Sequence, residues 1–262
     1  MNDIKIYELK RMDLKGALVI DGFPSVGLVS SIVANYLINT LHLEPIAIMD
    51  SIHFPTVSLI KNSEPHNPVR IYAGSKYGPR GRETGEKIVS FISEFQPQAN
   101  VVKQIGSTML DWCEDQRCGL VICPEGLVIE NNEPTSREKD MDLRVYGIGS
   151  TKKSRELLLE PNVLPFREGV ITGIAGVLLN EGKRRDFDVI SLLAEAHQDY
   201  PDARAAGRII EILDKLFFHI RLDPKPLYDE AERIEAQLKI IQRQTGKGKD
   251  VKIVPSEGAM YR

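Results

Sequence analysis

The stretch Ala17-Leu18-Val19-Ile20-Asp21-Gly22-Phe23-Pro24-Ser25-Val26-Gly27 decides the fold class. Its first four residues form a short apolar run, which is typical of a strand covered on both faces of a sheet. The glycines and the proline that follow indicate a tight turn. Apolar residues then recur at helical spacing and predict a helix over residues 25–41. A buried strand followed directly by a helix is typical of an α/β protein.

The rest of the chain continues this alternation. Further strands are expected at residues 3–9, 45–49, 56–60, 69–73, 88–93, 120–123, 144–148 and 189–193. One helix is expected over residues 99–116, and another is expected to run from a cap at Asp202 to His219. The small residues of 169–179 predict either a closely packed helix or a glycine-lined turn. The order is mostly β-α-β, so the fold class is α/β with a central sheet.

Two segments are predicted to be loops. Residues 76–85 contain Gly78, Pro79, Gly81 and Gly85 together with two arginines, a composition that indicates an exposed loop. Residues 124–141 are polar and acidic and predict a long loop after the strand at 120–123. Both segments would then lie on the surface, outside the sheet.

Composition and charge restrict the class of protein. The 262 residues suffice for one large domain with a well-buried core, or for two small domains. A formal net charge of −3 gives no overall basic field, so nucleic acid is disfavoured as the main partner. The first residues do not resemble a signal peptide, and no apolar run approaches the ~18 residues of a membrane span. With only three cysteines, this predicts a soluble cytoplasmic protein with reduced thiols and no membrane partner.

The C-terminal region differs from the rest. Residues 226–245 predict one helix, with Pro226 in its first turn and Gly246 just past its end. Its apolar residues form a narrow heptad seam between charged flanks. The seam consists of Leu227, Ala231, Ile234, Leu238 and Ile241. Such a seam can dock on the sheet of its own subunit or form a contact between subunits, and its narrow width favours the contact between subunits.

A flexible tail is expected after this helix. Residues 246–250 are a glycine- and lysine-rich linker, and residues 246–262 carry too little apolar surface to fold alone. As a random coil, the tail would reach on the order of 20–25 Å from its anchor. The expected organisation is an α/β core domain of residues 1–224, a helix of residues 225–245 and a tail of residues 246–262.

Three segments together resemble the archaeal proteasome assembly chaperone family. They are the turn into the first helix at 21–29, the glycine-spaced segment 169–176, and the Pro-Asp helix start in 200–206. The resemblance spans roughly residues 17–218. It implies a three-layer α/β/α sandwich similar to nucleoside phosphorylases but without their active site. It also implies a homo-oligomer with a role related to the proteasome.

The last three residues, Met260-Tyr261-Arg262, are similar to the docking tails of proteasome activators, which end in a hydrophobic residue, a tyrosine and any residue. A penultimate tyrosine offers a large apolar ring and one hydroxyl group. Met260 can fill an irregular apolar slot, and the terminal carboxylate of Arg262 can pair with a lysine of the partner. The resemblance implies docking between outer-ring subunits of the proteasome core particle. The alternative is a chance match on a structural homo-oligomer with a passive tail.

Other candidate sites have plainer interpretations. Gly22 to Gly27 could cradle a phosphate, but no lysine follows Gly27, and a tight turn with close backbone packing is favoured. The cysteines lack the C-x-x-C spacing of zinc sites and are expected to be core thiols. They are Cys113, Cys118 and Cys123. We therefore expect no metal and no cofactor.

An enzymatic function is the alternative to docking. Glu94 and Glu125 each follow a predicted strand, so together they could carry out acid-base catalysis in an enzyme of the nucleoside phosphorylase or hydrolase type. The histidines lie in no H-E-x-x-H motif and near no G-x-S-x-G elbow. They are His42, His53, His66, His197 and His219. Because no nucleophile or phosphate loop is recognisable, the sequence favours a non-enzymatic protein.

Overall fold

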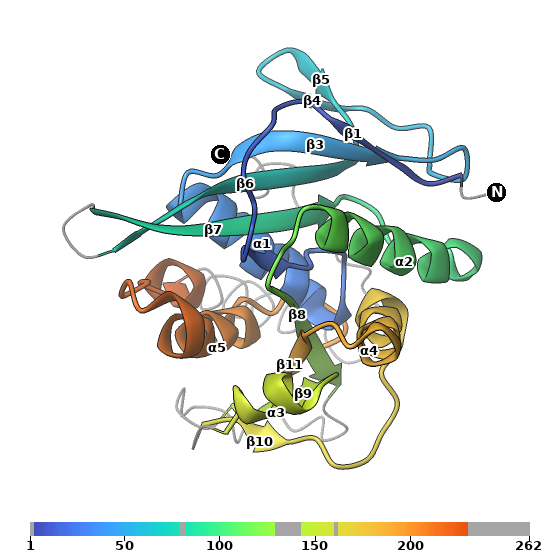
Figure 1. Ribbon diagram of the computed structural model, residues 1–262. Helices are drawn as coiled ribbons and strands as arrows, with labels where there is room; N and C mark the ends of the chain where they lie inside the picture. Colours follow the sequence, from blue (N-terminus) through green and yellow to red (C-terminus); the bar gives the residue numbers. More distant parts are fainter. Residues whose placement is uncertain (1–2, 79–81, 129–142, 160–161, 230–262) are drawn as a thin grey trace, which may run out of the picture.

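The computed structural model describes residues 3–78, 82–128, 143–159 and 162–229. Within these residues, nine strands form one mixed sheet with the order β1-β3-β6-β7-β2-β8-β11-β9-β10 (Figure 1). Its strands are β1 (Lys5–Glu8), β2 (Leu18–Ile20), β3 (Glu44–Asp50), β6 (Val69–Gly78), β7 (Arg82–Ser93), β8 (Leu120–Val128), β9 (Val145–Gly149), β10 (Leu164–Pro165) and β11 (Val189–Ala196). A separate two-stranded sheet is formed by β4 (Leu59–Lys61) and β5 (Glu64–His66).

Four parallel strands, β7, β2, β8 and β11, form the middle of the sheet. In the register of this region, Leu18 of β2 lies between Ile88 of β7 and Leu120 of β8. The apolar run that begins at Ala17 is therefore hydrogen-bonded on both sides and buried on both faces, as the sequence predicts. The outer strands β1, β3, β6 and β9 each pair antiparallel with a neighbour.

Helices cover both faces of the sheet. They are α1 (Val29–Thr40), α2 (Ala99–Asp115), α3 (Lys152–Glu156), α4 (Gly173–Arg185) and α5 (Ala203–Leu213), with short 3-10 and π-helical turns at Val26–Leu28 and Asp214–Phe218. Ile105 of α2 and Leu178 of α4 belong to the apolar core on one face. Val33 of α1 and Ile209 of α5 belong to a second core on the other face. The two cores confirm the predicted three-layer α/β/α sandwich.

The prediction of a loop over residues 76–85 was wrong. Strands β6 and β7 continue as a long antiparallel hairpin in which Tyr77 pairs with Glu83 and Gly78 pairs with Arg82, and only residues 79–81 lie outside the described residues. Figure 1 shows this hairpin projecting beyond the body of the molecule. Its glycines have a low strand propensity, but pairing along the adjacent strand overrides such local preferences.

The loop predicted for residues 124–141 was wrong at its start. Strand β8 continues to Val128, which pairs with Ala196 of β11, and residues 129–142 lie outside the described part of the chain. The sequence analysis also missed β5, α3 and β10, which are two to five residues long. Elements this short carry too few residues for a recognisable period.

Other predictions were confirmed in detail. The segment 169–179 contains the start of helix α4, which settles that alternative in favour of a helix. The Asp202 carboxylate accepts a hydrogen bond from the Ala205 N–H at 3.0 Å and so caps α5, as predicted.

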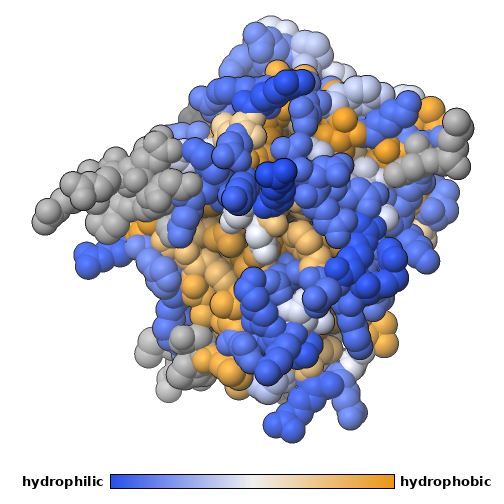
Figure 2. Space-filling view, in the orientation of Figure 1, coloured by the Kyte–Doolittle hydropathy of each residue, from blue (hydrophilic) through white to orange (hydrophobic). Residues whose placement is uncertain are grey.

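Figure 2 shows that polar residues dominate the surface on the side that it presents, with apolar residues gathered below β7. Among the helices that the structure describes, none has both the length and the apolar character needed to cross a membrane.

Candidate functional site

The predicted docking residues Met260, Tyr261 and Arg262 lie outside the described residues. So do four members of the heptad seam, Ala231, Ile234, Leu238 and Ile241. Leu227 is described, and it packs, partly buried, against the core that α1 and α5 share. What the structure describes of this region is therefore the base of the C-terminal helix, residues 214–229, which we call the helix base.

The helix base leaves α5 through a sharp turn. Asp214 makes this turn possible, because its carboxylate accepts hydrogen bonds from the backbone N–H groups of Ile220 at 2.9 Å and Arg221 at 3.1 Å. His219 and Arg221 both have a positive φ, 53° and 62°. The backbone oxygen of Asp214 accepts a further hydrogen bond from the His219 N–H at 2.7 Å. One aspartate thus reverses the chain direction after α5.

The chain then crosses to helix α1. The Tyr36 hydroxyl group donates a 2.7 Å hydrogen bond to the backbone oxygen of Asp223. Burial is the main cause that raises the pKa of Tyr36, so this hydroxyl remains a donor at neutral pH. A shallow groove between the two segments is lined by the C-terminal end of α1 and by residues 220–223 and Pro226.

A third attachment fixes the helix that starts at residue 225. The Tyr228 hydroxyl group donates a 2.7 Å hydrogen bond to Glu211 of α5, and Glu211 also pairs with Arg208 at 2.6 Å. The Tyr228 ring lies against Gly207, where any Cβ atom would stand 2.9 Å from the ring. Burial and then the Glu211 carboxylate raise the pKa of Tyr228. The C-terminal helix therefore starts from a defined place on the α1 and α5 side of the sandwich.

The turn after β2 contacts the start of α5. Gly27 has a φ of 61°, and a Cβ atom there would lie 2.7 Å from the backbone oxygen of His197. The Asp202 N–H donates a 2.8 Å hydrogen bond to the Gly27 oxygen, and the Asp202 carboxylate accepts one from the His197 ring at 2.9 Å. Two of the three segments that carry the family resemblance thus meet in space, which supports the tight-turn interpretation of Gly22 to Gly27.

The proposed carboxylate pair is arranged differently from the prediction. Glu94 follows β7 and forms an ion pair with Arg70, while Glu125 lies on β8, with β2 between the two strands. The charged neighbour of Glu125 is Asp21, at the end of β2. The sequence analysis missed Asp21, although an acidic residue directly after a buried apolar strand was a signal that could have found it. The predicted Glu94–Glu125 pair is therefore replaced by a pair of Asp21 and Glu125.

Asp21 is a buried acid, only 1% exposed. Burial raises its pKa to about 7, against the opposing effect of hydrogen bonds from the Phe23 N–H and the Cys123 thiol. Burial and the charge of Asp21 raise the pKa of Glu125 well above its ordinary value. All three cysteines are buried free thiols, as predicted, and burial raises the pKa values of Cys113 and Cys123. Near neutral pH, Asp21 can therefore hold or release a proton.

This buried acid predicts a specific pH dependence of stability. The folded protein binds the Asp21 proton more tightly than the unfolded chain does, whose aspartates titrate near ~3.9. The Asp21 contribution to the free energy of unfolding is therefore complete below about pH 4 and is lost as the pH rises to about 7. Asp21→Asn should lack this loss and gain roughly 4 kcal/mol on the wild type between pH 4 and pH 8, measured by urea unfolding. Parallel pH profiles for the two proteins would contradict the prediction.

The comparisons with known proteins identify the family. The sequence model of the PAC2 family matches residues 19–242. The chain belongs to the PAC2 family. This confirms the resemblance that the sequence analysis drew from three segments of the core.

Solved structures of archaeal proteins resemble this PAC2 protein over nearly its whole length. Pyrococcus furiosus PbaA, described as an archaeal homolog of proteasome-assembly chaperone, is 29% identical with a TM-score of 0.76, and 92% of each chain is covered. Pyrococcus furiosus PbaB, described as an archaeal proteasome activator, is 25% identical with a TM-score of 0.75, covering 92% of this chain and 100% of PbaB. A relative found by sequence, an uncharacterized protein of Methanocaldococcus jannaschii, is 26% identical over 248 residues, which cover 93% of each chain.

Proposed function

We propose that this PAC2 protein is a cytoplasmic homo-oligomer that binds the outer ring of the proteasome core particle through Met260, Tyr261 and Arg262. Its role is to assist proteasome assembly and, in second place, to open the gate of the core particle. The observation that carries the proposal is the similarity, over 92% of the chain, to both a homologue of a proteasome-assembly chaperone and a proteasome activator. The C-terminal motif adds the chemistry of docking.

The helix base supports this role because it fixes where the C-terminal region starts. Hydrogen bonds at Asp214, Tyr36 and Tyr228 attach residues 214–229 to two helices of the core. Copies of the chain in one oligomer would then present their C-terminal regions from equivalent positions. A three-residue anchor binds weakly by itself, but several linked anchors raise the effective concentration and so the avidity.

The enzymatic alternative has less support. Glu94 is paired with Arg70, so it does not face Glu125 as an acid-base partner. Asp21 and Glu125 are close to each other, but a likeness of fold to an enzyme does not establish an activity. A thermal-shift screen with nucleosides tests this alternative, since a saturable stabilisation would favour an enzyme of the nucleoside phosphorylase type.

Deletion of residues 260–262 tests the proposal directly. The truncated chain should keep its native mass and melting temperature but lose co-purification with the proteasome core particle. It should also lose any stimulation of peptide hydrolysis by that particle. Retained binding would remove tail docking and leave a structural homo-oligomer with a passive tail. Measuring the native mass of both forms checks the homo-oligomer at the same time.

A further inference from the structure

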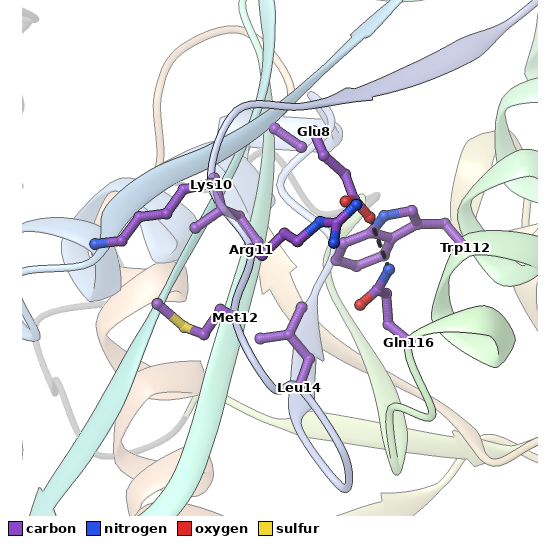
Figure 3. Close-up of a pocket in the computed structure, with 9 residues that line it drawn as sticks. Glu8, Lys10, Arg11, Met12, Leu14, Trp112 and Gln116 are labelled. Atoms are coloured by element: carbon purple, nitrogen blue, oxygen red, sulfur yellow. Dashed lines mark hydrogen bonds between the residues drawn. The ribbon is translucent and has the colours of Figure 1, made fainter.

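A cavity lies at the β1 edge of the sheet, far along the chain from the C-terminal region. It has a volume of about 270 Å³ and lies between the connector from β1 to β2, strand β3 and the end of helix α2 (Figure 3). Its lining includes Glu8, Arg11, Leu14, Ile46, Trp112 and Gln116. This volume accommodates a molecule the size of an amino acid, although it is small for a cofactor site.

The walls of this cavity are held by the backbone. The N–H groups of Leu9 and Lys10 both donate to the backbone oxygen of Ile46, at 2.8 and 3.1 Å. At the other end of the connector, the Gly16 N–H donates to the Arg117 oxygen at 2.8 Å. Because the connector is fixed at both ends, the cavity is a preformed feature of the fold and its lining does not depend on a loose loop.

Its inner wall is apolar but carries one buried donor. Leu14 and Ile46 are 2% and 3% exposed, and Trp112 is 8% exposed with its ring edge-on to Phe91 at 5.5 Å. The Trp112 Nε1–H is buried and finds no acceptor among the residues that the structure describes. A buried N–H group without an acceptor is costly, so a ligand that supplies an oxygen atom here would gain more than an ordinary hydrogen bond.

The rim carries one cation that the fold does not use. Lys10 forms an ion pair with Glu44, and Glu8 accepts a 2.9 Å hydrogen bond from the Gln116 amide. Arg11 is an exposed residue with no ion pair in the described part of the chain, and Figure 3 shows its side chain extending from the connector toward Glu8 and Trp112. The rim of the cavity is polar and its inner wall is apolar. A guanidinium group at such a rim suits a carboxylate, which it can bind through two parallel hydrogen bonds, while the Glu8 carboxylate on the same rim is bound by Gln116.

We propose that this cavity binds a small apolar carboxylate the size of an aliphatic amino acid. Arg11 binds the carboxylate, Leu14 and Ile46 contact the apolar body, and the Trp112 indole N–H donates to a ligand oxygen. The free amino acid and the C-terminal residue of a peptide share this chemistry. The lining of this cavity contains no residue of the C-terminal region, so the ligand proposal is tested independently of proteasome docking.

Trp112 provides the measurement, because it is the only tryptophan of the 262-residue sequence. Titration of the full chain with leucine and with N-acetyl-leucine should change its fluorescence and move its single indole N–H resonance, with saturation near about 1 mM for a ligand of this size. Saturation by both probes indicates a carboxylate site open to a peptide end, and saturation by leucine alone indicates a free amino acid. N-acetyl-leucinamide, which lacks the carboxylate, should bind at least about tenfold more weakly.

Two variants assign the contacts. Arg11→Gln should weaken the binding of N-acetyl-leucine or leucine about tenfold or more. Arg167 is an exposed arginine beyond β10, so the control variant Arg167→Gln should leave the affinity unchanged. Trp112→Phe keeps an aromatic ring but removes the N–H with the rest of the five-membered ring, so it should also lower the free energy of unfolding. Calorimetry on the folded variant should show about fivefold weaker binding. The proposal is overturned if neither probe gives a saturable change at tenfold higher concentration, or if the amide binds as tightly as the acid.

Discussion

Replacing Tyr261 by alanine is expected to weaken binding to the proteasome core particle at least about 30-fold. The tyrosine supplies most of the apolar surface of the three-residue anchor, and truncation of a central aromatic anchor typically costs 2 kcal/mol or more. Because the proposed oligomer binds through several tails at once, the loss multiplies over the tails that engage together. Surface plasmon resonance with immobilised core particle measures the change, and a peptide-hydrolysis assay measures any loss of gate opening.

The phenylalanine variant separates the ring from the hydroxyl group. Tyr261→Phe keeps the ring packing and removes one hydrogen bond, so it should weaken binding by about fivefold and less than alanine does. Tyr7→Ala is the matched control, since Tyr7 is a half-exposed tyrosine on β1, outside the proposed docking region. Equal losses for the phenylalanine and alanine variants would contradict the importance of ring packing. A loss of similar size for Tyr7→Ala would contradict docking by the tail.

The second large effect is expected from Gly22→Ala in the turn after β2. A Cβ atom at this position would lie 2.3 Å from the backbone oxygen of Phe91 and 2.5 Å from the Cβ atom of Ala34. Both neighbours belong to a strand and a helix of the core, so neither can move without displacing the element that carries it. The variant should lose about 3 kcal/mol of unfolding free energy, which corresponds to a melting temperature lower by roughly 6–12 °C.

Gly16→Ala is the control for this prediction. Gly16 has a φ of 74°, but a Cβ atom there would have nothing within 4 Å. The change should therefore cost only the backbone term of about 1 kcal/mol. Denaturant unfolding of the two variants side by side measures the difference. If Gly22→Ala is no less stable than Gly16→Ala, the close contact between the turn and β7 is not what selects glycine at position 22.

Local patterns predicted the elements in the middle of the sandwich well. The apolar runs that became β2, β8 and β11 and the helical spacing of α1 are recognisable because strands and helices buried in the centre repeat apolar residues at short range. The Asp202 cap was predicted for the same reason, since the capping residue and the N–H that it binds are three positions apart. Each of these features involves residues that are neighbours in the sequence.

The elements that failed depend on distant partners. Nothing near residues 76–85 indicates a strand, and only pairing of Tyr77 with Glu83 and extension of β6 alongside β7 make one. Glu125 was recognised as a strand-end acid, but its neighbour Asp21 is about a hundred positions away along the chain. The cavity beside Trp112 likewise unites residues from three separate segments. Sequence spacing contains no signal that residues so far apart in the chain will be neighbours in the fold.

The sequence by itself determined the α/β class, the buried central strands and the family resemblance, and it supplied the C-terminal motif, whose docking role stays a prediction. Each of these follows from local periodicity, turn residues or a short contiguous motif, in which all the interacting groups lie within a few residues. Only the tertiary structure decided which acid lies beside Glu125, how the helix base is attached through Tyr36 and Tyr228, and that Arg11 points toward Trp112. These contacts depend on the order and register of strands, which form by long-range packing of the whole chain.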